Sequence, residues 1–137
     1  MILDDLTRSY LEKASVRLEA LHFYRDRGAY SDVVREAQEL VELLLKAVLR
    51  ASGVEVPKVH DVGRSLDANR DVLPAGIAAR LEELKRISKR LRKERELSFY
   101  GAEDFIPTQE YDLQDAEQAI QEARLVVEVV RTALPGY

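Results

Sequence analysis

The segment SDVVREAQELVELLLKAVL, residues 31–49, constrains the fold more than any other feature, because it is apolar around nearly the whole circumference of a helix. One stripe recurs at spacings of three and four residues, and further leucines occupy the other sides: Val34, Ala37, Val41, Leu44 and Val48, then Leu40, Leu43, Leu45 and Leu49. A helix that is apolar on nearly all sides must be surrounded by other elements. The sequence therefore predicts that this helix is the central, most buried one.

Capping signals set the ends of the first two helices. An apolar stripe over residues 3–27 predicts a first helix, and Gly28 ends it because glycine readily adopts the left-handed backbone that closes helices. Ser31 and Asp32 then offer an N-cap oxygen and a first-turn negative charge to the central helix. Gly53 is placed to end that helix.

Two more long helices are predicted in the second half of the chain. Pro74 is well placed as the first residue of a helix that reaches Leu97 or Phe99, with an apolar seam of Ile77, Leu81, Leu84, Ile87 and Leu91. Asp112 is the expected N-cap of the last helix, and Asp115 lies at its third position. The inward face of that helix consists of Ala116, Ala119, Ile120, Ala123, Val127 and Val130.

The complete pattern predicts an all-α fold, an antiparallel up-and-down helical bundle of four long helices plus one short helix. The short helix is expected within residues 59–69, with Asp61 as its N-cap and with Val62 and Leu66 facing inward. A chain of 137 residues is long enough for one core, so residues 1–137 are expected to form a single domain.

The chain has the composition of a water-soluble protein, with 46% apolar and 34% charged residues. Its apolar runs are far shorter than the roughly 20 residues that cross a bilayer, so we expect no membrane partner. Charged residues interrupt the first apolar residues, as they do not in a secretory signal: Asp4, Asp5, Arg8 and Glu12. These features favour a cytoplasmic location.

Several classes of enzyme are excluded by the residue types that the chain lacks. With no cysteine, and with His22 and His60 as its only histidines, it cannot use a thiol nucleophile or build a histidine-rich metal site. We therefore expect no metal and no cofactor. His22 is expected to be partly buried near the end of the first helix, and His60 to cap a helix together with Asp61.

A strip of cations interrupts an otherwise acidic chain, whose net charge is -4. It has seven cations within eleven residues: Lys85, Arg86, Lys89, Arg90, Arg92, Lys93 and Arg95. Like charges four residues apart repel by roughly 0.2 to 0.5 kcal/mol a pair, so a surface for anions is one explanation. The other is a solvated helix face neutralised by acids further along the chain: Glu103, Asp104, Glu110, Asp112, Asp115 and Glu117.

Arg95 differs from the other cations in the side of the helix that it occupies. At roughly 100° per residue, Arg95 continues the apolar seam that Leu84 and Leu91 define, so it is expected to face inward. An arginine stays charged, and a cation on a buried seam needs an anionic or polar partner. That partner is either a carboxylate, on Glu94, Glu96 or another helix, or an anion bound in a cleft.

The ordered features resemble the HEPN domain over nearly the whole chain. The residues that carry the resemblance are the central helix of residues 31–49, PKVHDVG after it, RKERELSFYGAEDFIP, and YDLQDAEQAIQEARLVVE. They are similar to small prokaryotic HEPN proteins that often occur beside a minimal nucleotidyltransferase. The resemblance implies an antiparallel bundle, usually dimeric, with functional residues near the end of the fourth helix at a cleft on the dimer seam.

The resemblance also shows what this chain lacks. Many HEPN ribonucleases have an arginine, a polar residue, and a histidine four to six residues after the arginine. Arg95 and Glu96 match the beginning, but the histidine is absent: the residues that follow are Ser98, Phe99, Tyr100, Gly101 and Ala102, with Tyr100 at the nearest expected place. A tyrosine is a poor general base at neutral pH, whereas its hydroxyl or ring and an arginine fork suit holding a phosphate or a base.

These considerations leave three hypotheses. The leading one is a nucleotide- or RNA-binding and interaction module, a homodimer that partners a minimal nucleotidyltransferase in a toxin–antitoxin-like pair, with Arg95, Glu96, Ser98 and Tyr100 as ligand-binding residues. By analogy with related toxins, Tyr100 is also a candidate acceptor of nucleotidyl groups. The second is a metal-independent endoribonuclease toxin in which Arg95 stabilises the charge of the transition state. The third is a purely structural accessory bundle in which Arg95 forms an interface ion pair.

Overall fold

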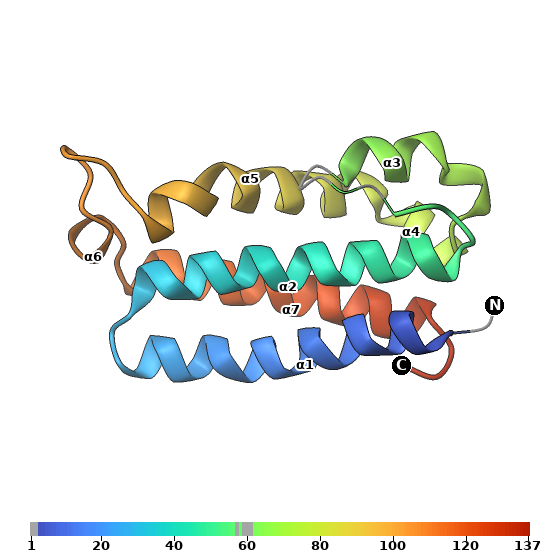
Figure 1. Ribbon diagram of the computed structural model, residues 1–137, viewed down its shortest axis with the longest axis horizontal. Coiled ribbons are helices and arrows are strands. Elements are labelled where there is room, and N and C mark those ends of the chain that lie inside the picture. The colour runs from blue at the N-terminus through green and yellow to red at the C-terminus, as the bar shows by residue number, and fades with distance from the viewer. Residues whose placement is uncertain (1–2, 57, 59–61) are drawn as a thin grey trace.

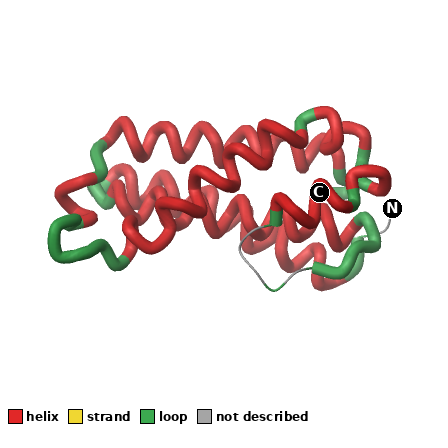
Figure 2. The backbone as a smooth tube through the Cα atoms, turned by 90° about the horizontal axis from the view of Figure 1, so that it is seen from above, coloured by secondary structure: helices red, strands yellow, loops and turns green. Residues whose placement is uncertain are grey.

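Helix α2 (Tyr30–Ala51) lies at the centre of the computed structural model, which describes residues 3–56, 58 and 62–137. The other long helices all pack against it: α1 (Asp5–Asp26), α5 (Leu81–Phe99) and α7 (Leu113–Ala133). Successive long helices run in opposite directions along one axis (Figures 1 and 2). The all-α bundle of four long helices is thus confirmed, and α2 occupies the central place that its apolar circumference predicted.

Short elements connect the long helices. They are α3 (Gly63–Ala68), a 3₁₀ turn η1 (Arg70–Val72), α4 (Ala75–Ala79) and α6 (Pro107–Glu110). In the described residues the strand-like pairing is limited to one isolated bridge between Ala102 and Phe105. Val62 and Leu66 are buried as expected, whereas Asp61 lies outside the described residues. No helix in the described part is both long and apolar enough to cross a membrane.

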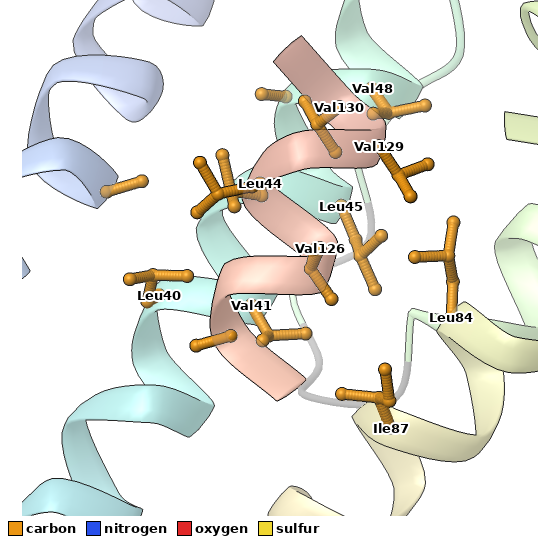
Figure 3. Close-up of a cluster of buried hydrophobic side chains, with 14 of the residues drawn as sticks. Leu40, Val41, Leu44, Leu45, Val48, Leu84, Ile87, Val126, Val129 and Val130 are labelled. Carbon is orange, nitrogen blue, oxygen red and sulfur yellow. The ribbon is translucent and has the colours of Figure 1, made fainter. Parts of the chain in front are cut away.

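The core lies where α2, α5 and α7 meet. Leu45 of α2 is surrounded by side chains from both neighbours, among them Leu84, Ile87 and Val126 (Figure 3). All four are fully buried. Burying a side chain of this size stabilises the folded state by roughly 1.5 to 3 kcal/mol, so the alignment of these three apolar faces holds α5 and α7 in place.

The helix expected from Pro74 to residue 97 or 99 is divided in two. Pro74 is the N-cap of α4 rather than its first residue, and the helix geometry is interrupted at Arg80 before α5 begins. The two pieces pack on different partners, since α4 contacts α7 while α5 runs along α2. The interruption at Arg80 lets the chain leave one helix and follow the other.

The helix caps agree with the sequence in part. Asp112 and Asp115 form the reciprocal capping box at the start of α7, and Gly28 and Gly53 have the left-handed backbone of helix ends. The expected cap of α2 was wrong. Its N-cap is Ala29 without a side-chain hydrogen bond, and Ser31 is buried within the first turn because the chain enters α2 directly from the turn at Gly28.

Asp4 caps α1 and ties it to α2. Its carboxylate accepts the backbone N–H of Thr7 at 2.9 Å and the side-chain N–H groups of Arg50 at 3.0 and 3.3 Å. The hydrogen bonds from Thr7, followed by that from Arg50, lower the pKa of Asp4 from 3.8 to about 2. The folded state thus stabilises the ionised form of Asp4 more than its protonated form.

This lowered pKa predicts how stability depends on pH. A carboxyl group with a lowered folded-state pKa contributes stability above 3.8, and that contribution is lost as the pH falls toward about 2. The difference in unfolding free energy between the wild type and Asp4→Ala should therefore be largest near neutral pH and vanish near pH 2, as measured by urea titration. Asp5→Ala, which removes the neighbouring carboxylate, is the control. A difference that stays constant with pH would contradict the role of the Asp4 carboxylate.

Candidate functional site at the end of helix α5

Arg95 lies at the interface of α5 and α2, with 22% of its side chain exposed. Its Nε donates to the Gln38 side-chain oxygen at 3.1 Å, and a terminal nitrogen donates to Glu39 Oε1 at 2.9 Å. The inward orientation expected from the seam is confirmed. The partner is an acid on another helix and not Glu94 or Glu96.

Two guanidinium groups converge on Glu39. Arg35, one turn earlier on α2, contacts the same oxygen, Oε1, at 2.8 Å, and the Arg35 and Glu39 side chains are about as little exposed as that of Arg95. Two permanent cations thus share one carboxylate at a point that solvent still reaches. The local charge balance is positive, which makes this place attractive to a further anion.

A buried polar row continues from Gln38 along α2. The Gln38 amide donates to Glu42 at 2.9 Å, and Lys46 donates to the other carboxylate oxygen of Glu42 at 2.8 Å. Gln38 and Glu42 are both buried, where polar groups need partners. The sequence did not lead us to these residues, although a polar row at four-residue spacing on an otherwise apolar helix is a signal that could have found them.

The four residues expected to form the site are not brought to one place. Ser98 is buried and its hydroxyl donates to the Arg95 carbonyl at 3.1 Å, which is a structural role. Glu96 is exposed, and its carbonyl accepts the backbone N–H of Tyr100 at 2.8 Å. Five residues along a helix amount to about 140° of rotation, so Arg95 points into the seam while Tyr100 points out.

Phe99 joins the arginine pair and Tyr100 extends beyond it. The two rings meet edge to face with their centres 4.8 Å apart, and 52% of Phe99 and 76% of Tyr100 are exposed. The Arg35 guanidinium lies 5.4 Å from the centre of the Phe99 ring, within the range of cation–π attraction. The site therefore combines two arginines with an exposed aromatic pair.

Gly101 ends α5 at this place for steric reasons. Its φ is +70°, and a Cβ atom there would lie 2.5 Å from the Phe105 carbonyl oxygen and 2.5 Å from the Pro107 ring. Only glycine fits so close a turn. The turn therefore fixes where the helix stops and leaves the two aromatic rings at its end.

Several cations of the strip pair with acids other than those expected. Lys85 pairs with Asp67 at 2.6 Å, and this hydrogen bond raises the pKa of Lys85 and lowers the pKa of Asp67. Arg90 pairs with Glu122 of α7, which Arg86 also approaches at 3.8 Å. Among the acids proposed as neutralising partners, Glu117 contacts Arg25 instead. Asp67 and Glu122 come from α3 and α7, the helices that flank this part of α5.

Glu94 faces a small cavity of about 220 Å³ on the other side of α5. It accepts the hydroxyl of Tyr111 at 2.5 Å. Burial, and then this hydrogen bond to Glu94, raise the pKa of Tyr111. The phenol therefore stays protonated, and both groups serve to fasten α5 to the loop before α7.

His22 takes no part in this site. His22 is partly buried, as expected, and its Nε2 lies 2.9 Å from a terminal nitrogen of Arg124. Burial, followed by the charge of Arg124, lowers the pKa of His22. His60 lies outside the described residues. Among the residues that the structure does describe, no three acidic, histidine or cysteine side chains come together to hold a metal.

One comparison with known proteins gives a family, and another gives a similar fold. The family model of the HEPN domain matches residues 7–133. The crystal structure of TT1696 from Thermus thermophilus is similar, with a TM-score of 0.79 and 25% sequence identity over 96% of this chain and 100% of that chain. A comparison with curated proteins found no match.

Proposed function

We propose that this chain, which belongs to the HEPN domain family, is a nucleotide- or RNA-binding and interaction module. The convergence of Arg35 and Arg95 on one oxygen of Glu39 carries the proposal. A phosphate offers more negative charge and more acceptor oxygens than a carboxylate, and it suits two guanidinium forks. The exposed rings of Phe99 and Tyr100 beside these arginines offer faces on which a base can stack.

The same end of the bundle also suits a protein partner. The C-terminal end of α5, α6 and the beginning of α7 lie together there (Figure 1). Large apolar side chains are exposed on these elements: Leu97, Phe99, Tyr100, Ile106 and Leu113. Exposed apolar patches mark interaction surfaces. The proposal includes a homodimer formed through this end, with a minimal nucleotidyltransferase as the further partner and the cytoplasm as its place.

The test compares two arginines that both form ion pairs between helices. Arg95→Ala should weaken the binding of nucleoside triphosphates at least about tenfold, since a hydrogen bond to a charged group contributes roughly 1.5 to 3 kcal/mol. Arg17→Ala is the matched control, because Arg17 of α1 pairs with Glu36 of α2 at 3.5 Å and is similarly exposed. Thermal shift and calorimetry with each nucleotide give affinity and stability together. Unchanged nucleotide affinity in Arg95→Ala would refute the site.

A purely structural role remains as a second candidate, and the ion pair of Arg95 with Glu39 favours it. In that case Arg95 holds α5 to α2, and the double variant Arg95→Glu with Glu39→Arg should recover much of the stability lost by either single change. Recovery of stability together with retained self-association, in a protein that binds no nucleotide before or after the swap, would establish the structural role. Loss of nucleotide binding in a stable swapped variant supports the proposed function.

A further inference from the structure

A polar groove separates α3 from the first half of α5, at a distance from Arg95. Its volume is about 540 Å³. Five cations line it: Arg64, Lys85, Arg86, Lys89 and Arg92. It also contains two carboxylates, Asp67 and Glu82. This α3–α5 groove concentrates positive charge on a protein whose net charge is -4.

The two carboxylates are already paired with Lys85 of the groove and with Arg70 beside it. Asp67 pairs with Lys85 at 2.6 Å, and Glu82 contacts Lys85 at 3.4 Å and Arg70 at 3.0 Å. Arg64 and Lys89 are exposed and form no ion pair with any other described residue. The groove therefore keeps uncompensated positive charge, which attracts an anionic ligand.

The cations of the groove lie in line with the aromatic end of α5. At roughly 100° per residue, Lys85, Lys89 and Arg92 fall within about 60° of one another around the helix, and Phe99 and Tyr100 lie about 20° outside that sector on either side. From Lys85 to Phe99 the helix rises about 21 Å. One side of α5 thus begins with cations and ends with exposed rings.

The length of this row decides the kind of ligand. A nucleic-acid strand advances about 3.4 Å per nucleotide when stacked, so about 21 Å corresponds to roughly six nucleotides, and to fewer if the strand is extended. A single nucleotide cannot reach both ends. Cations along a groove that lead to stacking rings are the arrangement by which proteins hold single strands without reading their sequence.

We propose that the α3–α5 groove binds the phosphate backbone of a single-stranded polynucleotide whose bases reach Phe99 and Tyr100. This inference rests on the proposed function and deepens it, because it extends the ligand at Phe99 and Tyr100 from one nucleotide to a strand. Glu96 is the exposed acid in the same row, between the cations and the rings. Its charge opposes the strand and limits the affinity.

The experiment measures fluorescence anisotropy of labelled oligo-uridylate of about one to twelve nucleotides, with oligo-thymidylate in parallel, at several salt concentrations. We expect affinity to rise up to roughly six nucleotides and then level off. Lys89→Glu and Arg64→Glu should each weaken binding of the longer strands roughly tenfold and flatten the salt dependence. Both should leave binding of nucleoside triphosphates unchanged. Glu96→Gln should strengthen binding of long strands.

Lys13→Glu is the control, because it reverses an exposed charge on α1, on the far side of the bundle from α5 (Figure 1). Unchanged binding of long strands in Lys89→Glu and Arg64→Glu overturns the inference, as does an affinity independent of strand length. Equal competition by an acidic peptide overturns it also. A preference for RNA or for DNA supports it and identifies the sugar.

Failure of the groove differs from failure of the nucleotide site. If nucleoside triphosphates bind and need Arg95 but long strands bind no better, only the groove assignment fails. If long strands bind and need Lys89 while Arg95→Ala has no effect, the groove stands and the Arg95 site fails. If neither nucleotides nor strands bind to the folded protein, both proposals are wrong. Circular dichroism of each variant confirms folding, and the exposed positions of Arg64 and Lys89 make unfolding unexpected.

Discussion

Leu45→Ala is expected to lower the free energy of unfolding by about 3 to 5 kcal/mol, the largest effect of any change considered for this protein. Leu45 is fully buried on the central helix, where side chains of α5 and α7 meet it (Figure 3). Removing it takes away apolar contacts and leaves a cavity between α2 and the two helices that pack against it here, α5 and α7. Because their other contacts hold α5 and α7 in place, these helices can move only partly into the cavity.

Urea unfolding followed by circular dichroism measures this loss. Leu6→Ala is the matched control, since Leu6 lies on α1 with 43% of its surface exposed, and its loss should change the free energy by less than about 1 kcal/mol. Equal effects of the two changes would mean that the packing around Leu45 is not what stabilises the bundle. A lower midpoint with an unchanged slope shows that stability has fallen while the surface exposed on unfolding is the same.

Arg90→Ala has the second largest expected effect, a loss of about 2 to 3 kcal/mol. Nε of Arg90 donates to Glu122 at 2.5 Å, a terminal nitrogen of Arg90 contacts the same oxygen, and only 9% of Glu122 is exposed. Removing one partner of a buried ion pair costs roughly 3 to 5 kcal/mol because the other charge is left uncompensated. The smaller value expected here reflects the partial exposure of Arg90.

Two variants make this second prediction specific. Arg86→Ala removes the exposed arginine that lies 3.8 Å from the same carboxylate, and it should cost no more than about 0.5 kcal/mol. The double variant Arg90→Leu with Glu122→Leu should restore much of the stability, because an apolar pair has no charge to desolvate. If Arg90→Ala were no worse than Arg86→Ala, the tie between α5 and α7 would not depend on this ion pair. Without this tie α5 should open locally more often, so amide exchange along it should be faster. Both candidate sites lie on this helix.

The sequence predicted the inward position of Arg95 but not its partner. The angular position of a residue on a helix follows from 3.6 residues per turn, so the seam of Leu84 and Leu91 was enough to orient the guanidinium. Its partner Glu39 lies 56 residues earlier in the chain. That contact depends on which part of α2 lies beside the end of α5, which no local pattern contains.

The difference between closeness in sequence and closeness in space also explains why the residues expected to form the site do not lie together. Arg95 and Tyr100 are close in the sequence, but a helix rotates them to different sides, and the ring that the Arg35 guanidinium approaches is that of Phe99. The basic strip was evident from residue types alone. Which of its cations are neutralised depended on Asp67 and Glu122, and those acids approach only when α3 and α7 pack beside α5.

The sequence by itself determined the helices, their apolar faces and the central place of α2, because the period of apolar residues and the capping signals are local properties of the chain. The tertiary structure decided the break at Arg80, the sharing of Glu39 by two arginines, and the groove between α3 and α5. Each of these depends on the distance and orientation between elements far apart in the chain. The packing of whole helix faces determines such contacts, and the residues adjacent in the sequence do not predict them.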